Sequence, residues 1–482
     1  MSDPNLKQKT AKGLLWGSLS NGAQQLFGLA FGIVLSNLLT PDDYGMVGQL
    51  AIFTLIAATI QESGFTAALV NRPTMEHRDY NAVFWCILPI SLALYALLFF
   101  SAPLISWYYN EPVLVPLSRY VFLSFVISGL GIVPAARLLK TMRVRERTLS
   151  NLTALCISGG VGIALAYNGH SYWGIATQSL VYIGTNTLLY WSFARWRPTL
   201  TFDFRPIREM VGFSSKLLVT NILLHVNNNF FSVLLGRFFN PAAVGNYVQA
   251  NKWNFTGHGL VTGMVNGVAQ PLFVETRGDD ERQARVFRKM MRFTCFMAFP
   301  VMFGLAIIAR ELIVVTITEK WLGAAQMLSI LCVSGAFLPV TALYTQFLLS
   351  RGFSDIYMKG LFGLVVVQAL TAIALYPLGV IPMLWGYVVV NLIWTGVWHY
   401  FIRRELRISY RQGFLDLAPF LGITLVTMAA TYFAIGALEV TPLVSMLLKI
   451  VMAAVVYVVL LWIAGAEILK ESVAFLLKKH RK

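Results

Sequence analysis

The chain has 482 residues, of which 57% are hydrophobic and only 12% are charged, yet its formal net charge is +16. Soluble domains carry about 25% charged residues, so this composition excludes a soluble globular protein, a disordered chain and a secreted disulfide scaffold. We therefore predict an integral membrane protein. The four cysteines lie inside apolar runs without metal-ligand spacing, which predicts no metal site and no cofactor.

Apolar runs of about 20 residues, long enough to cross a bilayer, recur along the whole chain. The runs are continuous rather than alternating, which favours helices over a β-barrel. The predicted fold class is therefore an all-α integral membrane protein. It has about 14 transmembrane helices, which in chain order cover residues 14–39, 44–70, 80–108, 115–138, 147–168, 171–193, 210–239, 242–272, 290–318, 321–350, 355–378, 381–402, 415–436 and 441–464.

The basic residues beside these runs are distributed unevenly. When successive loops are assigned to alternating sides, one side holds nearly all of the 38 Lys and Arg residues. Lys and Arg close to spans are retained in the cytoplasm, so we expect both termini to be cytoplasmic. The net charge then reflects the orientation of the chain in the membrane, and no nucleic-acid partner is needed to explain it. The other basic residues are Arg119, Arg237, Arg310 and Lys320 on the outer side, and Lys216, Lys252 and Lys449 within spans.

The first two predicted spans have a counterpart later in the chain. A shift of 200 residues without gaps aligns them with the seventh and eighth spans. Proline and glycine recur at one fixed offset in equivalent outer turns, which indicates an internal duplication. An even number of spans separates the two copies, so the repeat is parallel, about an axis along the membrane normal. The identical pairs are Asn21 and Asn221, Phe31 and Phe231, Leu35 and Leu235, Pro41 and Pro241, Gly45 and Gly245, and Gln49 and Gln249.

Four motifs link the chain to a known family. They are LLTPDDYG at 38–45, ESGFTAALVNR at 62–72, YWGIATQ at 172–178 and FNPAAVGNYVQANK at 239–252. Over roughly residues 8–410 the sequence resembles the polysaccharide transporter family of O-antigen and exopolysaccharide flippases. This family is part of the multidrug, oligosaccharidyl-lipid and polysaccharide exporter superfamily. The resemblance implies two six-helix lobes around a central cavity, which we place at residues 1–208 and 209–411. Two further helices and a cytoplasmic amphipathic tail would occupy residues 412–482.

The resemblance also implies a function in cell-surface polysaccharide biosynthesis. It predicts that the chain moves undecaprenyl-pyrophosphate-linked oligosaccharide repeat units from the cytoplasmic to the outer leaflet by alternating access. The location would be the bacterial cytoplasmic membrane. Membrane lipid and the glycan polymerase machinery are the expected partners. The glycan, the coupling ion (H⁺ or Na⁺) and the oligomeric state stay open.

Polar residues at membrane depth are costly and face a cavity or a partner. They concentrate in the first, second, seventh and eighth spans, so we predict that this duplicated pair lines the cavity. Lys252, near mid-depth, is the favoured ligand for a pyrophosphate, although it could instead pair with an acid or extend to the interface. Extension to the cytoplasmic interface explains Lys216 nearly as well as substrate contact does. The residues expected to bind glycan hydroxyls are Asn21, Gln25, Gln49, Asn221, Gln249 and Asn251.

Two further residues are candidates for coupling. Glu62 could bind a proton or cation, or it could be a counter-ion, and the sequence favours neither. His225 could titrate during transport, but a hydrogen-bonded core histidine is the favoured interpretation. The basic segments at 137–147 and 277–292 could attract a pyrophosphate or anionic lipid, although membrane topology is their main explanation.

Two other functions compete with a flippase. An ion-coupled drug or metabolite antiporter of the same superfamily would call for acidic or aromatic cavity residues, whereas the predicted spans hold three Lys against Glu62. A membrane glycan polymerase or ligase would need catalytic groups on substantial loops, and the predicted outer loops are only a few residues long. The sequence therefore favours a transporter over an enzyme.

Overall fold

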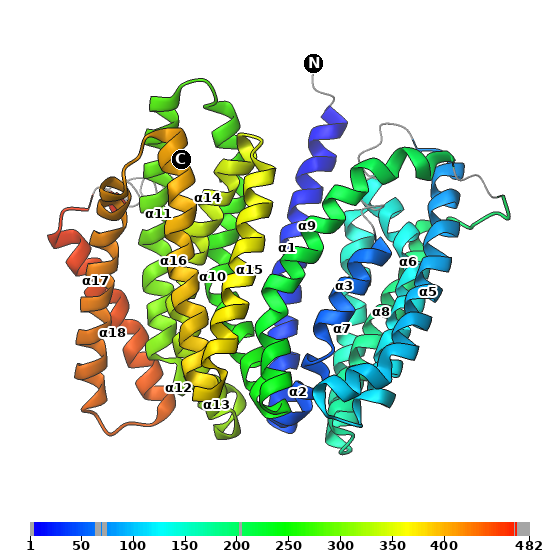
Figure 1. The fold of residues 1–482 in the computed structure, drawn as a ribbon, viewed down its shortest axis with the longest axis horizontal. Helices are drawn as coiled ribbons and strands as arrows, with labels where there is room; N and C mark the ends of the chain where they lie inside the picture. The colour runs from blue at the N-terminus through cyan, green and yellow to red at the C-terminus, as the bar shows by residue number, and fades with distance from the viewer. Residues whose placement is uncertain (1–3, 63–68, 70–74, 202–204, 467, 470–482) are drawn as a thin grey trace. The chain divides into compact units, whose positions relative to one another are not determined.

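A computed structural model describes residues 4–62, 69, 75–201, 205–466 and 468–469, and the regular structure in these residues is helical (Figure 1). The chain divides into two compact units, Met1–Gly245 and Asn246–Lys482. The lobes that the family resemblance implies have their first boundary at residue 208, whereas the compact units meet at residue 245. The lobes stay a prediction. The predicted tail at 467–482 lies outside the described residues, apart from residues 468–469.

The first unit is built from long helices that pack side by side. Helix α5 packs against α6, α6 against α8, and α7 against both α8 and α1. Phe122 and Phe125 of α6 are almost fully buried in a core cluster of this unit. The helices are α1 (Pro4–Leu38), α2 (Pro41–Gly48), α3 (Ala51–Glu62), α5 (His77–Tyr109), α6 (Leu114–Lys140), α7 (Val144–Tyr167), α8 (Ser171–Ala194) and α9 (Arg205–Phe238).

The second unit contains most of α10 and the helices that follow. Helix α11 packs against α13 and α17, α15 against α16, and α17 against α18. Phe287 and Phe299 of α11 are fully buried in its interior. The helices are α10 (Pro241–Glu275), α11 (Asp280–Ile307), α12 (Ala309–Ile317), η1 (Glu319–Trp321), α13 (Leu322–Gly335), α14 (Leu338–Ser350), α15 (Ser354–Leu375), η2 (Tyr376–Leu378), α16 (Val380–Leu406), α17 (Tyr410–Gly436) and α18 (Pro442–Ile463).

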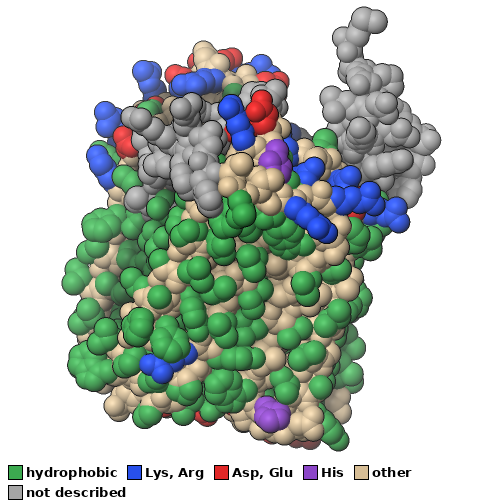
Figure 2. Space-filling model, turned by 90° about the vertical axis from the view of Figure 1, so that its right-hand side faces the viewer, with side chains coloured by type: hydrophobic (Ala, Val, Ile, Leu, Met, Phe, Trp, Pro, Cys, Tyr) green, Lys and Arg blue, Asp and Glu red, His purple; other side chains and the backbone are tan. Residues whose placement is uncertain are grey.

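The prediction of an all-α membrane protein is confirmed. Among the described residues, 10 helical segments are long and apolar enough to cross a membrane, by length and composition alone. In the face drawn in Figure 2, hydrophobic side chains cover most of the height and charged side chains gather at one end. The four remaining predicted spans correspond to α1, α8, α9 and α10, which are helical. In α1 the stretch Gly22–Leu38 is apolar but too short to be counted, whereas Asn and Gln residues lower the hydropathy of α8, α9 and α10. The count of 14 therefore stays a prediction.

Two predicted spans are each divided into two helices. The span at 44–70 is broken at Gln49 and Leu50, between α2 and α3. The span at 321–350 is broken at Ala336 and Phe337, and Pro339 follows in the first turn of α14. Proline starts a helix well because its missing N–H has no intrahelical partner at that position. A continuous apolar run can therefore contain a helix end that hydropathy does not detect.

The turns before α2 and α10 are built alike. Helix α1 ends at Leu38 and α2 begins at Pro41, while α9 ends at Phe238 and α10 begins at Pro241. In the first turn Thr40 Oγ1 accepts a hydrogen bond from the Asp43 amide at 3.3 Å. In the second, Asn240 Oδ1 accepts one from the Ala243 amide at 2.9 Å. Each capping side chain satisfies an amide that the helix leaves free, so the two turns share one capping design.

The same two turns meet inside the first unit. A Cβ atom on Gly45 would overlap the carbonyl group of Pro241, and one on Gly245 would overlap the carbonyl group of Pro41. The contact is reciprocal, because each glycine faces the proline of the other turn. Only glycine allows backbones to approach this closely. We call these residues the paired Pro/Gly turns.

Candidate functional site

Gln49 is the predicted site residue with the most unusual surroundings. It lies at the break between α2 and α3 and is 1% exposed. Neither its amide nitrogen nor its amide oxygen has a hydrogen-bond partner among the described residues. A buried polar group left in this state costs about 1–3 kcal/mol. The amide therefore has unused hydrogen-bonding capacity that a polar ligand or a water molecule can satisfy.

Gln61, near the end of α3, has the hydrogen-bond partners that Gln49 lacks. Its amide nitrogen donates to Ser91 Oγ at 2.7 Å and to the Phe125 carbonyl at 2.6 Å. Its amide oxygen accepts from Ser128 Oγ at 2.9 Å. These bonds tie α3 to α5 and α6, so this glutamine holds helices together within the first unit.

The other predicted residues of the first unit fall into three groups. Gln25 of α1 and Glu62, the last residue of α3, are exposed. Asn221 and His225 of α9 are half-buried, and the His225 ring has no hydrogen-bond partner among the residues described. Asn21 and Lys216 lie on α1 and α9, but their side chains lie outside the described part of the chain. The structure thus leaves the coupling role of Glu62 and His225 a prediction.

Helix α10 carries the predicted polar residues of the second unit. Lys252 and Asn251 are half-buried, and Gln249 is 1% exposed. Lys252 has no acidic partner within ion-pair distance among the described residues. Asn254, half a turn further along, is 3% exposed and its Oδ1 has no partner in the described part of the chain. Lys252 and Asn254 are two residues apart on this helix, so their side chains point to different faces of it.

Small residues on α13 make room for the asparagines of α10. A Cβ atom on Gly323 would lie 2.8 Å from Asn246 Nδ2, and one on Gly335 would overlap Asn254 Oδ1. Glycine at these positions lets the two helices approach closely while polar groups lie between them. Asn246 and Asn254 are therefore held against α13.

Lys449 of α18 has a partner that the sequence analysis did not identify. Its Nζ lies 2.5 Å from Glu311 Oε1 and 3.2 Å from the Ile307 carbonyl, and the residue is 5% exposed. Ser445 Oγ also lies 3.3 Å from Glu311 Oε1. The sequence pattern places Lys449 within a span but gives it no partner. The pairing leaves Lys252 as the described span lysine that has no acid beside it.

We expect Lys449→Met to lower the stability of the protein markedly. The substitution leaves the Glu311 carboxylate buried without its cation, which costs about 3–5 kcal/mol. Thermal unfolding of the purified protein in detergent measures the effect. The matched control is the double variant Lys449→Met with Glu311→Leu, which should recover most of the loss because it removes both charges. Equal unfolding temperatures for the single and double variants would contradict this account.

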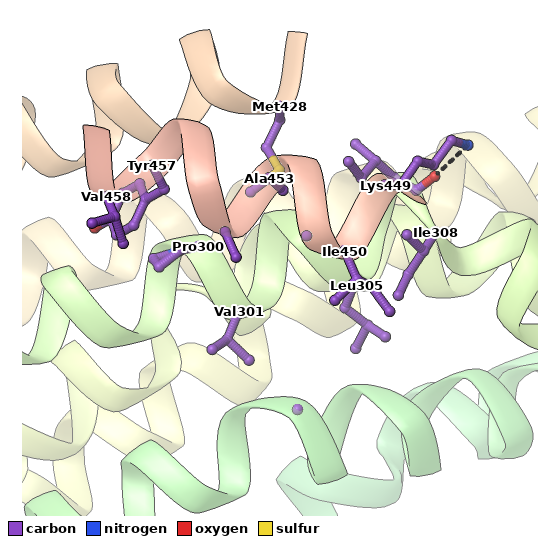
Figure 3. Close-up of a pocket in the computed structure, with 14 residues that line it drawn as sticks. Pro300, Val301, Leu305, Ile308, Met428, Lys449, Ile450, Ala453, Tyr457 and Val458 are labelled. Atoms are coloured by element: carbon purple, nitrogen blue, oxygen red, sulfur yellow. Dashed lines mark hydrogen bonds between the residues drawn. The ribbon is translucent and has the colours of Figure 1, made fainter. Parts of the chain in front are cut away.

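A pocket of about 450 Å³ lies beside this ion pair (Figure 3). In Figure 3 Lys449 lies at one end of the pocket, and the dashed line marks its hydrogen bond to the Ile307 carbonyl. The remaining walls are almost entirely apolar, so the pocket offers no free cation to a pyrophosphate. Its lining residues come from α10, α11, α17 and α18, with Ile308 after α11, and include Gly257, Pro300, Val301, Leu305, Ile308, Met428, Ile450, Ala453, Tyr457 and Val458.

No group of three or more His, Cys, Asp or Glu side chains that could hold a metal ion occurs among the described residues. The four cysteines are unpaired, and Cys295 and Cys332 are buried. Each unit, taken by itself, thus offers polar amides, and the second also offers Lys252, a span lysine with no acid beside it among the described residues. Such groups suit the binding of a polar or anionic molecule.

Comparison with known proteins gives a consistent picture. Residues 34–326 match a family model described as "Polysaccharide biosynthesis protein". The teichuronic acid biosynthesis protein TuaB of Bacillus subtilis is 22% identical over 437 residues, which is 90% of each chain. The lipopolysaccharide biosynthesis protein WzxC of Escherichia coli is 24% identical over 439 residues, 89% of this chain and 88% of that one. The succinoglycan biosynthesis transport protein ExoT of Rhizobium meliloti is 24% identical over 352 residues, 72% of this chain and 71% of that one.

Solved structures with similar folds are transporters. The lipid II flippase MurJ in an inward closed conformation superposes with a TM-score of 0.77 at 13% identity, covering 94% of this chain and 99% of that one. An inward-facing multidrug resistance transporter of the MATE family gives a TM-score of 0.64 at 17% identity, covering 80% of this chain and 94% of that one. At these identities the likeness establishes a shared fold.

Proposed function

Because the chain belongs to the polysaccharide biosynthesis protein family, as the resemblance of its motifs indicated, we propose that it is a flippase for lipid-linked glycans. It is a bacterial multi-pass membrane transport protein rather than an enzyme. Its cargo in this proposal is an undecaprenyl-pyrophosphate-linked oligosaccharide repeat unit. The protein moves the unit from the cytoplasmic to the outer leaflet by alternating access and so supplies cell-surface polysaccharide biosynthesis.

The main support for the proposal is the environment of Lys252. Its amine is half-buried and has no acidic partner among the described residues. Burying a cation is costly unless it is paired or bound to an anion, and Lys449 shows how this protein pairs one. A lipid pyrophosphate is a dense anion that forms charge-assisted hydrogen bonds with an ammonium group. The free lysine of α10 is therefore suited to the head group of such a lipid.

Amide side chains supply the contacts to sugar in this proposal. Gln49 is the best supported, because both of its amide atoms are without partners in the described structure. Gln25, Asn21, Asn221, Gln249 and Asn251 complete the proposed glycan site, and Lys216 is a second contact to the head group. Glu62 and His225 are the proposed coupling residues. Amide groups match sugar hydroxyls because they offer both donors and acceptors.

The proposed placement in the membrane follows from the charges of the loops. The protein spans the bacterial cytoplasmic membrane with 14 helices and both termini in the cytoplasm. Its lobes comprise residues 1–208 and 209–411, and two helices with an amphipathic tail follow at 412–482. Glycan polymerase machinery is a proposed neighbour, because it acts on the units that a flippase delivers.

A liposome assay tests this function directly. Purified protein is reconstituted with a lipid-linked oligosaccharide in the inner leaflet, and an added glycosidase that cannot enter the liposomes reports arrival in the outer leaflet. We expect cleavage of the inner pool only when the protein is present, and imposed H⁺ or Na⁺ gradients identify the coupling ion. Protein-free liposomes and liposomes with a cationic dye as cargo are the controls. Transport of the dye without movement of the glycan lipid would replace this proposal with a drug antiporter.

A further inference from the structure

Asp416 is a buried carboxylate held by two arginines of one helix. It lies in the second turn of α17 and is 2% exposed. Arg288 of α11 makes a bidentate contact with it, in which Nε donates to Oδ2 at 2.6 Å and a terminal nitrogen donates to Oδ1 at 3.0 Å. Arg292, one turn along α11, donates its Nε to Oδ1 at 2.6 Å. The cluster therefore joins α11 to α17 and carries one positive charge in excess.

The excess charge is accessible from outside the protein. Arg288 already satisfies Asp416 with a two-point contact, the arrangement in which arginine binds a carboxylate most firmly. The Arg292 side chain, which makes a single contact with this carboxylate, is 41% exposed, whereas the Asp416 side chain is 1% exposed. A guanidinium carries five N–H donors, so Arg292 has donors left for a second anion. The Arg292 donors are therefore exposed to a second anion, while the Asp416 carboxylate is buried.

An apolar pocket of about 240 Å³ begins at Arg292 and Asp416. It runs between the first half of α17 and the end of α18, and Leu415 at its edge is 54% exposed. The pocket thus combines one cationic end with apolar walls and is open to the surroundings. The other lining residues are Pro419, Phe420, Ile423, Leu461, Ala464, Ala466 and Ile468.

We propose that this pocket binds an anionic diacyl phospholipid. The phosphodiester receives hydrogen bonds from Arg292, and the upper part of one acyl chain packs against Leu415, Pro419 and Ile423. Basic pockets between transmembrane helices on the cytoplasmic side suit anionic lipid head groups, and this cluster falls on the side that loop charges place in the cytoplasm. Such a lipid is a resident neighbour of α11, α17 and α18, and this site does not depend on the proposed cargo of the flippase.

Lipid retention by the full chain tests the site. The purified protein is exchanged into detergent that contains either phosphatidylglycerol or phosphatidylcholine with the same acyl chains, and bound lipid is counted by native mass spectrometry. We expect preferential retention of phosphatidylglycerol, and about a tenfold loss of that retention in Arg292→Gln. The matched control is Arg285→Gln on the same helix, whose exposed side chain lies 3.7 Å from Glu281. It removes the same charge and should leave retention unchanged.

Two further measurements keep the result interpretable. Leu415→Trp fills the pocket without changing any charge, so it should weaken retention even if Arg292→Gln does not fold. Inorganic phosphate at matched phosphate concentration should neither displace the lipid nor raise the unfolding temperature as phosphatidylglycerol does. Equal retention of the two lipids, equal loss in the two arginine variants, or full replacement by inorganic phosphate would each overturn the proposal.

Discussion

Replacing Lys252 with alanine is expected to reduce surface glycan by about tenfold or more in cells that depend on this transporter. A hydrogen bond to a charged group contributes about 1.5–3 kcal/mol, which corresponds to roughly tenfold to a hundredfold in binding. Lys252 is half-buried and has no acid beside it in the described structure. The interaction that the substitution removes is therefore the one between Lys252 and the cargo. The measurement is surface polysaccharide in a deletion strain complemented with each variant at equal membrane abundance.

Stability measurements separate this role from a structural one. Lys252→Met removes a charge that has no acidic partner, so its unfolding temperature in detergent should stay equal to that of the wild type or rise. Lys449→Met removes a paired charge and should lower it. Lys252→Arg keeps the cation and should retain much of the transport. Normal surface glycan in Lys252→Ala, or a stability loss as large as that of Lys449→Met, would contradict the assignment.

The second large effect is expected at Gly45. A Cβ atom there would overlap the Pro241 carbonyl group, so Gly45→Ala requires the paired Pro/Gly turns to separate. We expect a loss of about 3 kcal/mol or more in stability, because the overlap is with backbone that cannot rotate away. Gly245→Ala should behave in the same way, since its Cβ would overlap Pro41. Thermal unfolding of the purified variants measures both.

A glycine elsewhere on α10 provides the control for this experiment. A Cβ atom on Gly263 would have no atom within 4 Å. Gly263→Ala should therefore stabilise the helix by up to about 1 kcal/mol through the ordinary preference of helices for alanine. The double variant of Gly45 and Gly245 should cost less than the two single variants together, because they disturb one contact. Equal behaviour of Gly45→Ala and Gly263→Ala would show that the close approach is unimportant for stability.

The sequence predicted the helical membrane fold well because long apolar runs have few alternatives in a bilayer. It also located the paired Pro/Gly turns, where a shared proline and glycine fix helix starts 200 residues apart. It did not predict the break at Gln49 and Leu50, because average hydropathy does not detect a local helix end. That break is where the partnerless glutamine amide lies.

The candidate site was less predictable, because its chemistry depends on contacts between distant residues. Gln49 and Gln61 look alike in sequence, yet one has no described partner and the other makes three hydrogen bonds. Lys252 and Lys449 were both assigned to spans, but Lys449 has an acid 138 residues away in the chain. Only tertiary structure distinguishes a satisfied polar group from a free one.

The paired Pro/Gly turns have the form of an isologous dimer interface within a single chain. Residue i of one copy contacts residue j of the other, and the reverse contact repeats it, as in a homodimer with a twofold axis. A half-length protein that dimerised through this surface would encode both contacts with one proline and one glycine. Fusion of two such genes would preserve the interface while freeing each copy to change elsewhere. Polar residues elsewhere in the two copies could then diverge without any loss of the contact between the turns.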